Sequence, residues 1–146
     1  MAKTTDKSTI VLMDDELFNM RWLMDFLEHL GFEVILARSA NEAMKLISEE
    51  IYRCLILDLN VPLVSQISES AKQLPEVYRK YPGLLVAKEA RNRGYRDRQV
   101  VIYSVHRDQE VAEESQKLGC TYILKGRPKA LKEELQRVLE FDPTDT

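Results

Sequence analysis

The sequence predicts an α/β domain built on a doubly wound sheet of five parallel strands. Five short runs rich in Val, Ile, Leu or Tyr alternate with segments of helical spacing, and polar residues follow the ends of four of them. A strand that is apolar on both faces is typical of a parallel sheet covered by helices on both sides. Right-handed crossovers through the intervening helices complete such a sheet. The runs are Thr9–Met13, Val34–Ala37, Cys54–Leu57, Val100–Tyr103 and Thr121–Leu124.

Each apolar run is followed by a segment in which apolar residues recur with the spacing of a helix. The first such segment ends before Gly31, the second begins with a capping box of Ser39 and Glu42, and the third begins after Pro82-Gly83. The fourth has Asp108 as its cap and the fifth is entered through Pro128. The residues predicted to face the core are Met20, Leu23, Met24, Leu27 and Leu30; Ala43, Met44 and Ile47; Leu84, Leu85 and Ala87; Val111, Ala112, Ser115 and Leu118; and Leu131, Leu135, Val138 and Leu139.

One connection is much longer than the roughly 2–6 residues that usually join a strand to a helix. It runs from Asp58 to Gly83, and we interpret residues 63–82 as an insertion. The stretch from Ser68 to Tyr81 is polar with some apolar positions, and it is predicted to hold a short helix, with Pro75 breaking it or starting a second one. Long connections of this kind are usually either functional or disordered.

Composition limits the remaining possibilities. A length of 146 residues fits one domain, predicted over 9–140, with tails at 1–8 and 141–146. The net charge of −3 argues against direct binding of nucleic acid, and no apolar stretch is long enough for a membrane helix or a secretion signal. Cys54 and Cys120 both lie in apolar runs, so we expect buried, reduced thiols and a cytoplasmic protein.

Polar side chains follow four of the predicted strands at the point where each strand ends. They are Asp14, Asp15, Asp58, Ser104 and Lys125. Ligands of open α/β sheets bind outside the carboxyl ends of the strands, so these side chains are expected to share one site. Clustered carboxylates repel one another, and Mg²⁺ relieves that repulsion. A carboxylate beside Mg²⁺ can attack phosphorus, while a lysine and a hydroxyl hold the phosphoryl oxygens. The pattern therefore predicts Mg²⁺-assisted phosphoryl transfer onto an aspartate.

These residues and their neighbours resemble a response regulator receiver domain of two-component signalling. The segments that carry the resemblance are Ile10–Glu16, Leu57–Pro62, Tyr103-Ser104 and Tyr122–Lys125. The resemblance covers nearly the whole chain apart from the insertion. It implies the flavodoxin-like receiver fold, in which the strand order is 2-1-3-4-5.

The resemblance also implies a role for each site residue. Asp58 would accept a phosphoryl group from a phosphohistidine of a histidine kinase or phosphotransfer protein. Mg²⁺, or Mn²⁺, would be bound directly by Asp15, Asp58 and the main-chain carbonyl of Asn60, and by Asp14 through a water molecule. Ser104 and Lys125 would bind the phosphoryl oxygens.

A change of state would follow phosphorylation. Ser104 and Tyr122 match the hydroxyl and the aromatic ring that move together in the family. The movement reshapes a surface made by the helix around Val111–Leu118, the strand Thr121–Leu124 and the helix around Leu131–Leu139, where an output protein docks. We therefore expect a protein switch that turns over no metabolite, acts as a monomer or a phosphorylation-dependent dimer, and is either a stand-alone receiver or part of a longer protein.

Three features depart from the family pattern. Gly126 follows Lys125 where a proline is usual, and Val105 follows Ser104 where alanine or glycine is usual. The third is the insertion, for which we hypothesise a role in gating or selecting the kinase. These departures keep open the alternative of a docking module that needs no phosphorylation. An aspartate-nucleophile phosphatase is a weaker alternative, because Asn60 stands where such an enzyme needs an acidic residue. A flavin carrier is disfavoured by the acidic sheet edge.

Val105 yields a testable hypothesis about the lifetime of the phosphorylated form. A β-branched side chain next to Ser104 would hinder the water molecule that hydrolyses the aspartyl phosphate. We expect the phosphorylated Val105→Ala variant to decay several-fold faster than the wild type when both are followed after removal of the phosphodonor. Equal half-lives would show that Val105 does not control access to the phosphate.

Overall fold

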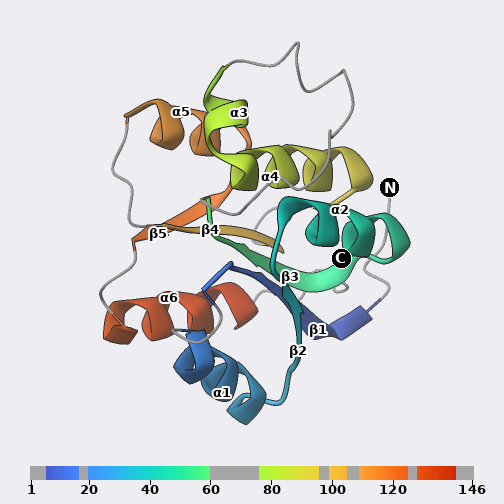
Figure 1. Cartoon of the computed structure of the whole chain (residues 1–146). Helices are drawn as coiled ribbons and strands as arrows, with labels where there is room; N and C mark the ends of the chain where they lie inside the picture. The colour runs from blue at the N-terminus through green and yellow to red at the C-terminus, as the bar shows by residue number, and fades with distance from the viewer. Residues whose placement is uncertain are drawn as a thin grey trace.

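The computed structural model describes residues 6–16, 20–59, 76–95, 99–104, 109–124 and 128–140. Its centre is a sheet of five parallel strands in the order β2-β1-β3-β4-β5, which confirms the predicted fold class and strand order (Figure 1). The strands are β1 (Asp6–Met13), β2 (Glu33–Ala37), β3 (Tyr52–Leu57), β4 (Val100–Ser104) and β5 (Thr121–Leu124).

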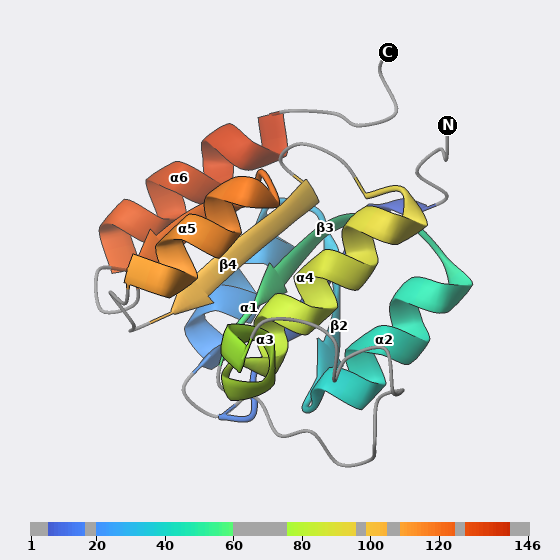
Figure 2. The same cartoon turned by 90° about the horizontal axis from the view of Figure 1, so that it is seen from above.

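Helices cover both faces of the sheet (Figures 1 and 2). One face is covered by α1 (Arg21–His29) and α6 (Pro128–Glu140). The other is covered by α2 (Ala40–Glu49), α3 (Glu76–Lys80), α4 (Pro82–Arg93) and α5 (Gln109–Lys117). Helix α3 matches the short helix that was predicted within the long connection. It begins directly after Pro75.

The apolar strands divide their side chains between two cores. In β1, Val11 and Met13 pack under α2 and α4, whereas Ile10 and Leu12 pack against α1 and α6. All four are at most 1% exposed. Successive residues of a strand point to opposite faces of the sheet, and helices cover both faces. This explains why the strands are continuous apolar runs, as predicted.

Several local predictions were also confirmed. The Ser39 hydroxyl accepts a hydrogen bond from the Glu42 N–H at 3.1 Å and caps α2. Glu42 does not return the bond to Ser39 as a full capping box requires; its carboxylate accepts from the N–H of Arg38 instead. Gly31 has a φ of 98°, which only glycine adopts readily, and it follows the end of α1.

Some predicted core residues are not buried. Leu30 is 36% exposed because α1 ends at His29 and Leu30 lies at the cap. Ala112 is exposed because the buried stripe of α5 runs through Val111 and Ser115. Cys120 is only partly buried, since it lies just before β5, whereas Cys54 is fully buried. Burial raises the pKa of the Cys54 thiol to about 12, so it stays protonated.

The sheet edge that is formed by the starts of β3 and β4 is fixed by buried hydrogen bonds. The Tyr95 hydroxyl accepts from the Tyr52 N–H and donates to the Glu50 carbonyl, both at 2.9 Å, and Gln99 Nε2 donates to the Tyr52 carbonyl at 3.0 Å. Burial raises the pKa of Tyr95. Arg91, in the last turn of α4, donates to the main-chain carbonyls of Leu118, Tyr95 and Gly119. Its role is therefore structural.

Within the described residues, no helix is long and apolar enough to cross a membrane.

Candidate functional site

The parallel hydrogen-bond ladder brings three aspartates to one edge of the sheet. Met13 and Leu57 are paired across β1 and β3, and the next residues are Asp14 and Asp58. The Asp58 N–H donates to the Met13 carbonyl at 2.9 Å, and the Asp14 N–H donates to the Ala37 carbonyl of β2 at 3.0 Å. The main chain of both aspartates is therefore held by the sheet itself, even though the strands end just before them.

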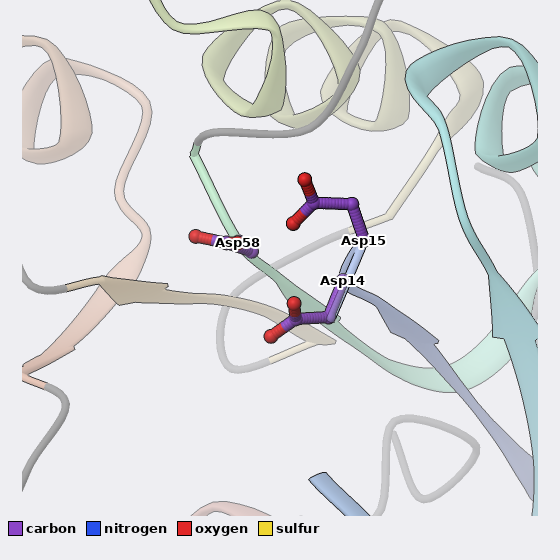
Figure 3. A group of neighbouring side chains, drawn as sticks. All are labelled: Asp14, Asp15 and Asp58. Carbon is purple, nitrogen blue, oxygen red and sulfur yellow. The ribbon is translucent and has the colours of Figure 1, made fainter. Parts of the chain in front are cut away.

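The carboxylates of Asp14, Asp15 and Asp58 converge in front of these strand ends (Figure 3). One oxygen from each lies within 4.8 Å of the others. Asp14 and Asp58 are 1% and 7% exposed, whereas Asp15 is exposed to solvent. A group this close, partly desolvated and open on one side has the donor atoms and the spacing that a hard divalent cation requires.

The orientation of Asp14 is fixed locally. Its Oδ1 accepts a hydrogen bond from the Glu16 N–H at 2.8 Å, the usual geometry of an aspartate that begins a turn. This bond uses one carboxylate oxygen of Asp14. Asp15, which is exposed beside it, and Asp58, which directly follows β3, complete the group.

Ser104 lies at the same edge of the sheet. It is the last residue of β4 and is completely buried. Leu57 is paired with Ile102, so Ser104 stands one level beyond Asp58 on the neighbouring strand. Ser104 is itself paired with Leu124 of β5, the residue before Lys125.

Tyr122 occupies β5 level with Ile102 and is partly buried against the core under α2 and α4. It therefore lies two residues along the ladder from the Ser104–Leu124 pair, on a strand that directly adjoins β4. Asn60, Val105 and Lys125 lie outside the described residues.

Gly83 is a site residue whose importance the sequence did not indicate. Its N–H donates to the Leu59 carbonyl at 3.2 Å. A Cβ at this position would lie 2.3 Å from the Asp58 main-chain oxygen and 2.7 Å from Leu59 Cα. Both neighbours are main-chain atoms that cannot rotate away. Pro82-Gly83 was recognised only as the start of a helix, whereas the structure shows that α4 touches the main chain of Asp58 there.

The comparisons with known proteins agree with this architecture. No family model matches the chain. A CheY-like response regulator receiver domain protein from Methanospirillum hungatei superposes with a TM-score of 0.70 and 20% identity, over 91% of this chain and 94% of that one. The BeF3-activated receiver domain of RstA from Klebsiella pneumoniae superposes with a TM-score of 0.68 and 17% identity, over 91% and 99%. The fold is that of a response regulator receiver domain.

A sequence match supports the same relationship over a shorter stretch. The transcriptional regulatory protein CrdR of Helicobacter pylori is 36% identical over 58 residues. The match covers 40% of this chain and 27% of that protein. In this receiver fold the carboxyl edge of the sheet, where Asp14, Asp15 and Asp58 meet, is the position at which ligands of open α/β sheets bind.

The close approach of Gly83 can be tested by adding a single methyl group. We expect Gly83→Ala to lower the free energy of unfolding by about 1–3 kcal/mol, because α4 must move away from Asp58. It should also weaken Mg²⁺ binding several-fold, since the main chain of Asp58 shifts with it. Urea unfolding and calorimetric Mg²⁺ titration measure the two effects.

Gly31→Ala is the matched control for this variant. It adds the same methyl group where no atom lies within 4 Å, at a positive φ of 98° and near the opposite edge of the sheet. It should cost stability through backbone strain but leave Mg²⁺ binding unchanged. Unchanged Mg²⁺ affinity in Gly83→Ala would mean that the contact with Asp58 does not position the site.

Proposed function

We propose that this protein is a phospho-acceptor signalling switch in which Asp58 receives the phosphoryl group. The observation that carries the proposal is the gathering of three carboxylates within 4.8 Å at the carboxyl edge of a receiver fold. Asp58 is the central candidate because it holds the position of the phospho-acceptor in the receiver pattern, and its main chain is bound to β1 and contacted by α4.

The transfer is a displacement at phosphorus. A carboxylate oxygen of Asp58 forms a bond to the phosphorus of a phosphohistidine, the P–N bond breaks, and the imidazole of the donor leaves with the bonding electron pair. Asp15, Asp58 and the carbonyl of Asn60 would hold Mg²⁺ or Mn²⁺ directly, and Asp14 would hold it through a water molecule. When bound, the cation supplies positive charge that offsets the repulsion between the carboxylates and the incoming phosphoryl oxygens.

The remaining residues of the proposed site respond to the phosphoryl group on Asp58. Lys125 and Ser104 are proposed to hold the phosphoryl oxygens, and Tyr122 to respond when Ser104 moves. Support comes from the ladder, which places Ser104 one level beyond Asp58 and pairs it with the residue before Lys125. The readout surface would be formed by α5, β5 and α6, where an output protein binds.

The proposal also includes the partner proteins and the location in the cell. A histidine kinase or phosphotransfer protein is the proposed donor, and the protein is proposed to turn over no metabolite. A cytoplasmic setting is supported by the fully buried, protonated thiol of Cys54.

Intact-mass measurement after incubation with Mg²⁺ and a small phosphodonor tests the proposal. We expect one phosphoryl group per chain in the wild type, none when Mg²⁺ is chelated, and none in Asp58→Asn. Asp25→Asn, which changes an exposed aspartate of α1, should be phosphorylated as the wild type is.

Two results would contradict the proposal. Modification that persists in Asp58→Asn would place the acceptor elsewhere. A folded wild type that takes no phosphoryl group from either a small donor or a phosphohistidine protein would favour the docking module.

A further inference from the structure

The short helix α3 connects the long insertion to two other helices. Val77 and Tyr78 are 5% and 4% exposed and belong to the core under α2 and α4. Figures 1 and 2 show α3 beside the start of α4. A helix of five residues is not stable alone, so α3 is held by this packing.

Tyr78 extends the contact from α3 to α5. Its hydroxyl donates a hydrogen bond to Glu114 Oε2 at 2.8 Å, and Lys88 of α4 lies over its ring at 5.8 Å. Lys117 also donates to Glu114, at 3.2 Å. The hydrogen bond from Tyr78 is the main reason why the pKa of Glu114 is lowered, so the acceptor is an ionised carboxylate and the bond is charge-assisted.

The two helices that Tyr78 contacts are both linked to residues of the site. The first turn of α4 contacts the main chain of Asp58 through Gly83. Helix α5 follows β4, whose last residue is Ser104. A hydrogen bond between two oxygens is lost when their separation grows beyond about 3.0–3.5 Å. Because Tyr78 is anchored in the core, a displacement of α5 larger than the Glu114 side chain can follow would break their hydrogen bond.

We propose that the Tyr78–Glu114 hydrogen bond is a latch that holds α5 against the insertion in the unmodified protein and so opposes phosphorylation-linked movement of α5. The inference rests on the proposed function for its regulatory consequence. The insertion then acts as a built-in brake, because loss of the latch favours any state in which α5 is displaced.

Hydrogen exchange of the unmodified protein tests the latch itself. Tyr78→Phe removes only the hydroxyl and keeps the ring that packs in the core and under Lys88. We expect amide exchange of α5 to become about tenfold faster in this variant, while exchange of β1 stays unchanged. Glu114→Gln removes the acceptor charge and should give the same direction of change, which keeps the test valid if Tyr78→Phe folds poorly.

Glu113→Gln provides the matched control. Glu113 is the neighbouring carboxylate of α5, is exposed, and accepts a hydrogen bond from Gln109 of the same helix. It should leave the exchange of α5 close to that of the wild type. Wild-type exchange in both Tyr78→Phe and Glu114→Gln would overturn the latch.

Binding of beryllofluoride, a phosphoryl mimic, in the presence of Mg²⁺ tests the regulatory consequence. We expect Tyr78→Phe to bind it several-fold, and up to about tenfold, more tightly than the wild type and Glu113→Gln. Equal affinities would overturn the brake. If the wild type binds no beryllofluoride, the proposed function and the brake both fail. The exchange result then still decides whether the latch exists.

Discussion

Repulsion between like charges held in a small volume is the constraint on which this structure depends. The ladder between β1, β2 and β3 holds the main chains of Asp14 and Asp58 side by side, because their N–H groups donate to the carbonyls of Ala37 and Met13. Three carboxylates within 4.8 Å are unfavourable without a counter-charge. We propose that a divalent cation relieves this repulsion when it binds between the three carboxylates.

The rest of the fold supplies the stiffness that this arrangement needs. Both faces of the sheet are buried, and the opposite edge is fixed by the hydroxyl of Tyr95 and the guanidinium of Arg91. The long connection from β3 to α4 ends beside the residue at which it begins. The Gly83 N–H donates a hydrogen bond to the Leu59 carbonyl, so the two ends of this connection meet directly beside Asp58. Lengthening a loop that is closed in this way adds little entropic cost and leaves the scaffold unchanged.

Local patterns predicted much of this molecule. The bounds of β5 were predicted as Thr121–Leu124 and observed as such, and the apolar stripe of α6 was identified in full from Leu131 to Leu139. The convergence of Asp14, Asp15 and Asp58 was predicted because parallel strands place their carboxyl ends at one edge. Each of these predictions needs only the chain's own periodicity and one topological rule.

The features that sequence reasoning missed are contacts between distant segments. Nothing near Gly83 indicates that its missing side chain makes room for the main chain of Asp58. Nothing near Tyr78 indicates a carboxylate acceptor on a helix that begins at Gln109. Tyr95 resembles an ordinary core aromatic until its hydroxyl is seen between Tyr52 and Glu50. β1 likewise begins at Asp6 rather than Thr9, because pairing with Tyr52 extends it past the apolar run.

Thermal unfolding of the wild type and Asp15→Asn, each in chelator and in Mg²⁺, tests the central claim most directly. Mg²⁺ at about 100 times its Kd should raise the wild-type Tm by roughly 5–10 °C. Asp15→Asn removes one of the three charges, so its Tm in chelator should exceed that of the wild type and its response to Mg²⁺ should shrink. Asp25→Asn should behave as the wild type. The account would be contradicted if the wild-type Tm did not change with Mg²⁺ and the Tm of Asp15→Asn in chelator were lower than that of the wild type.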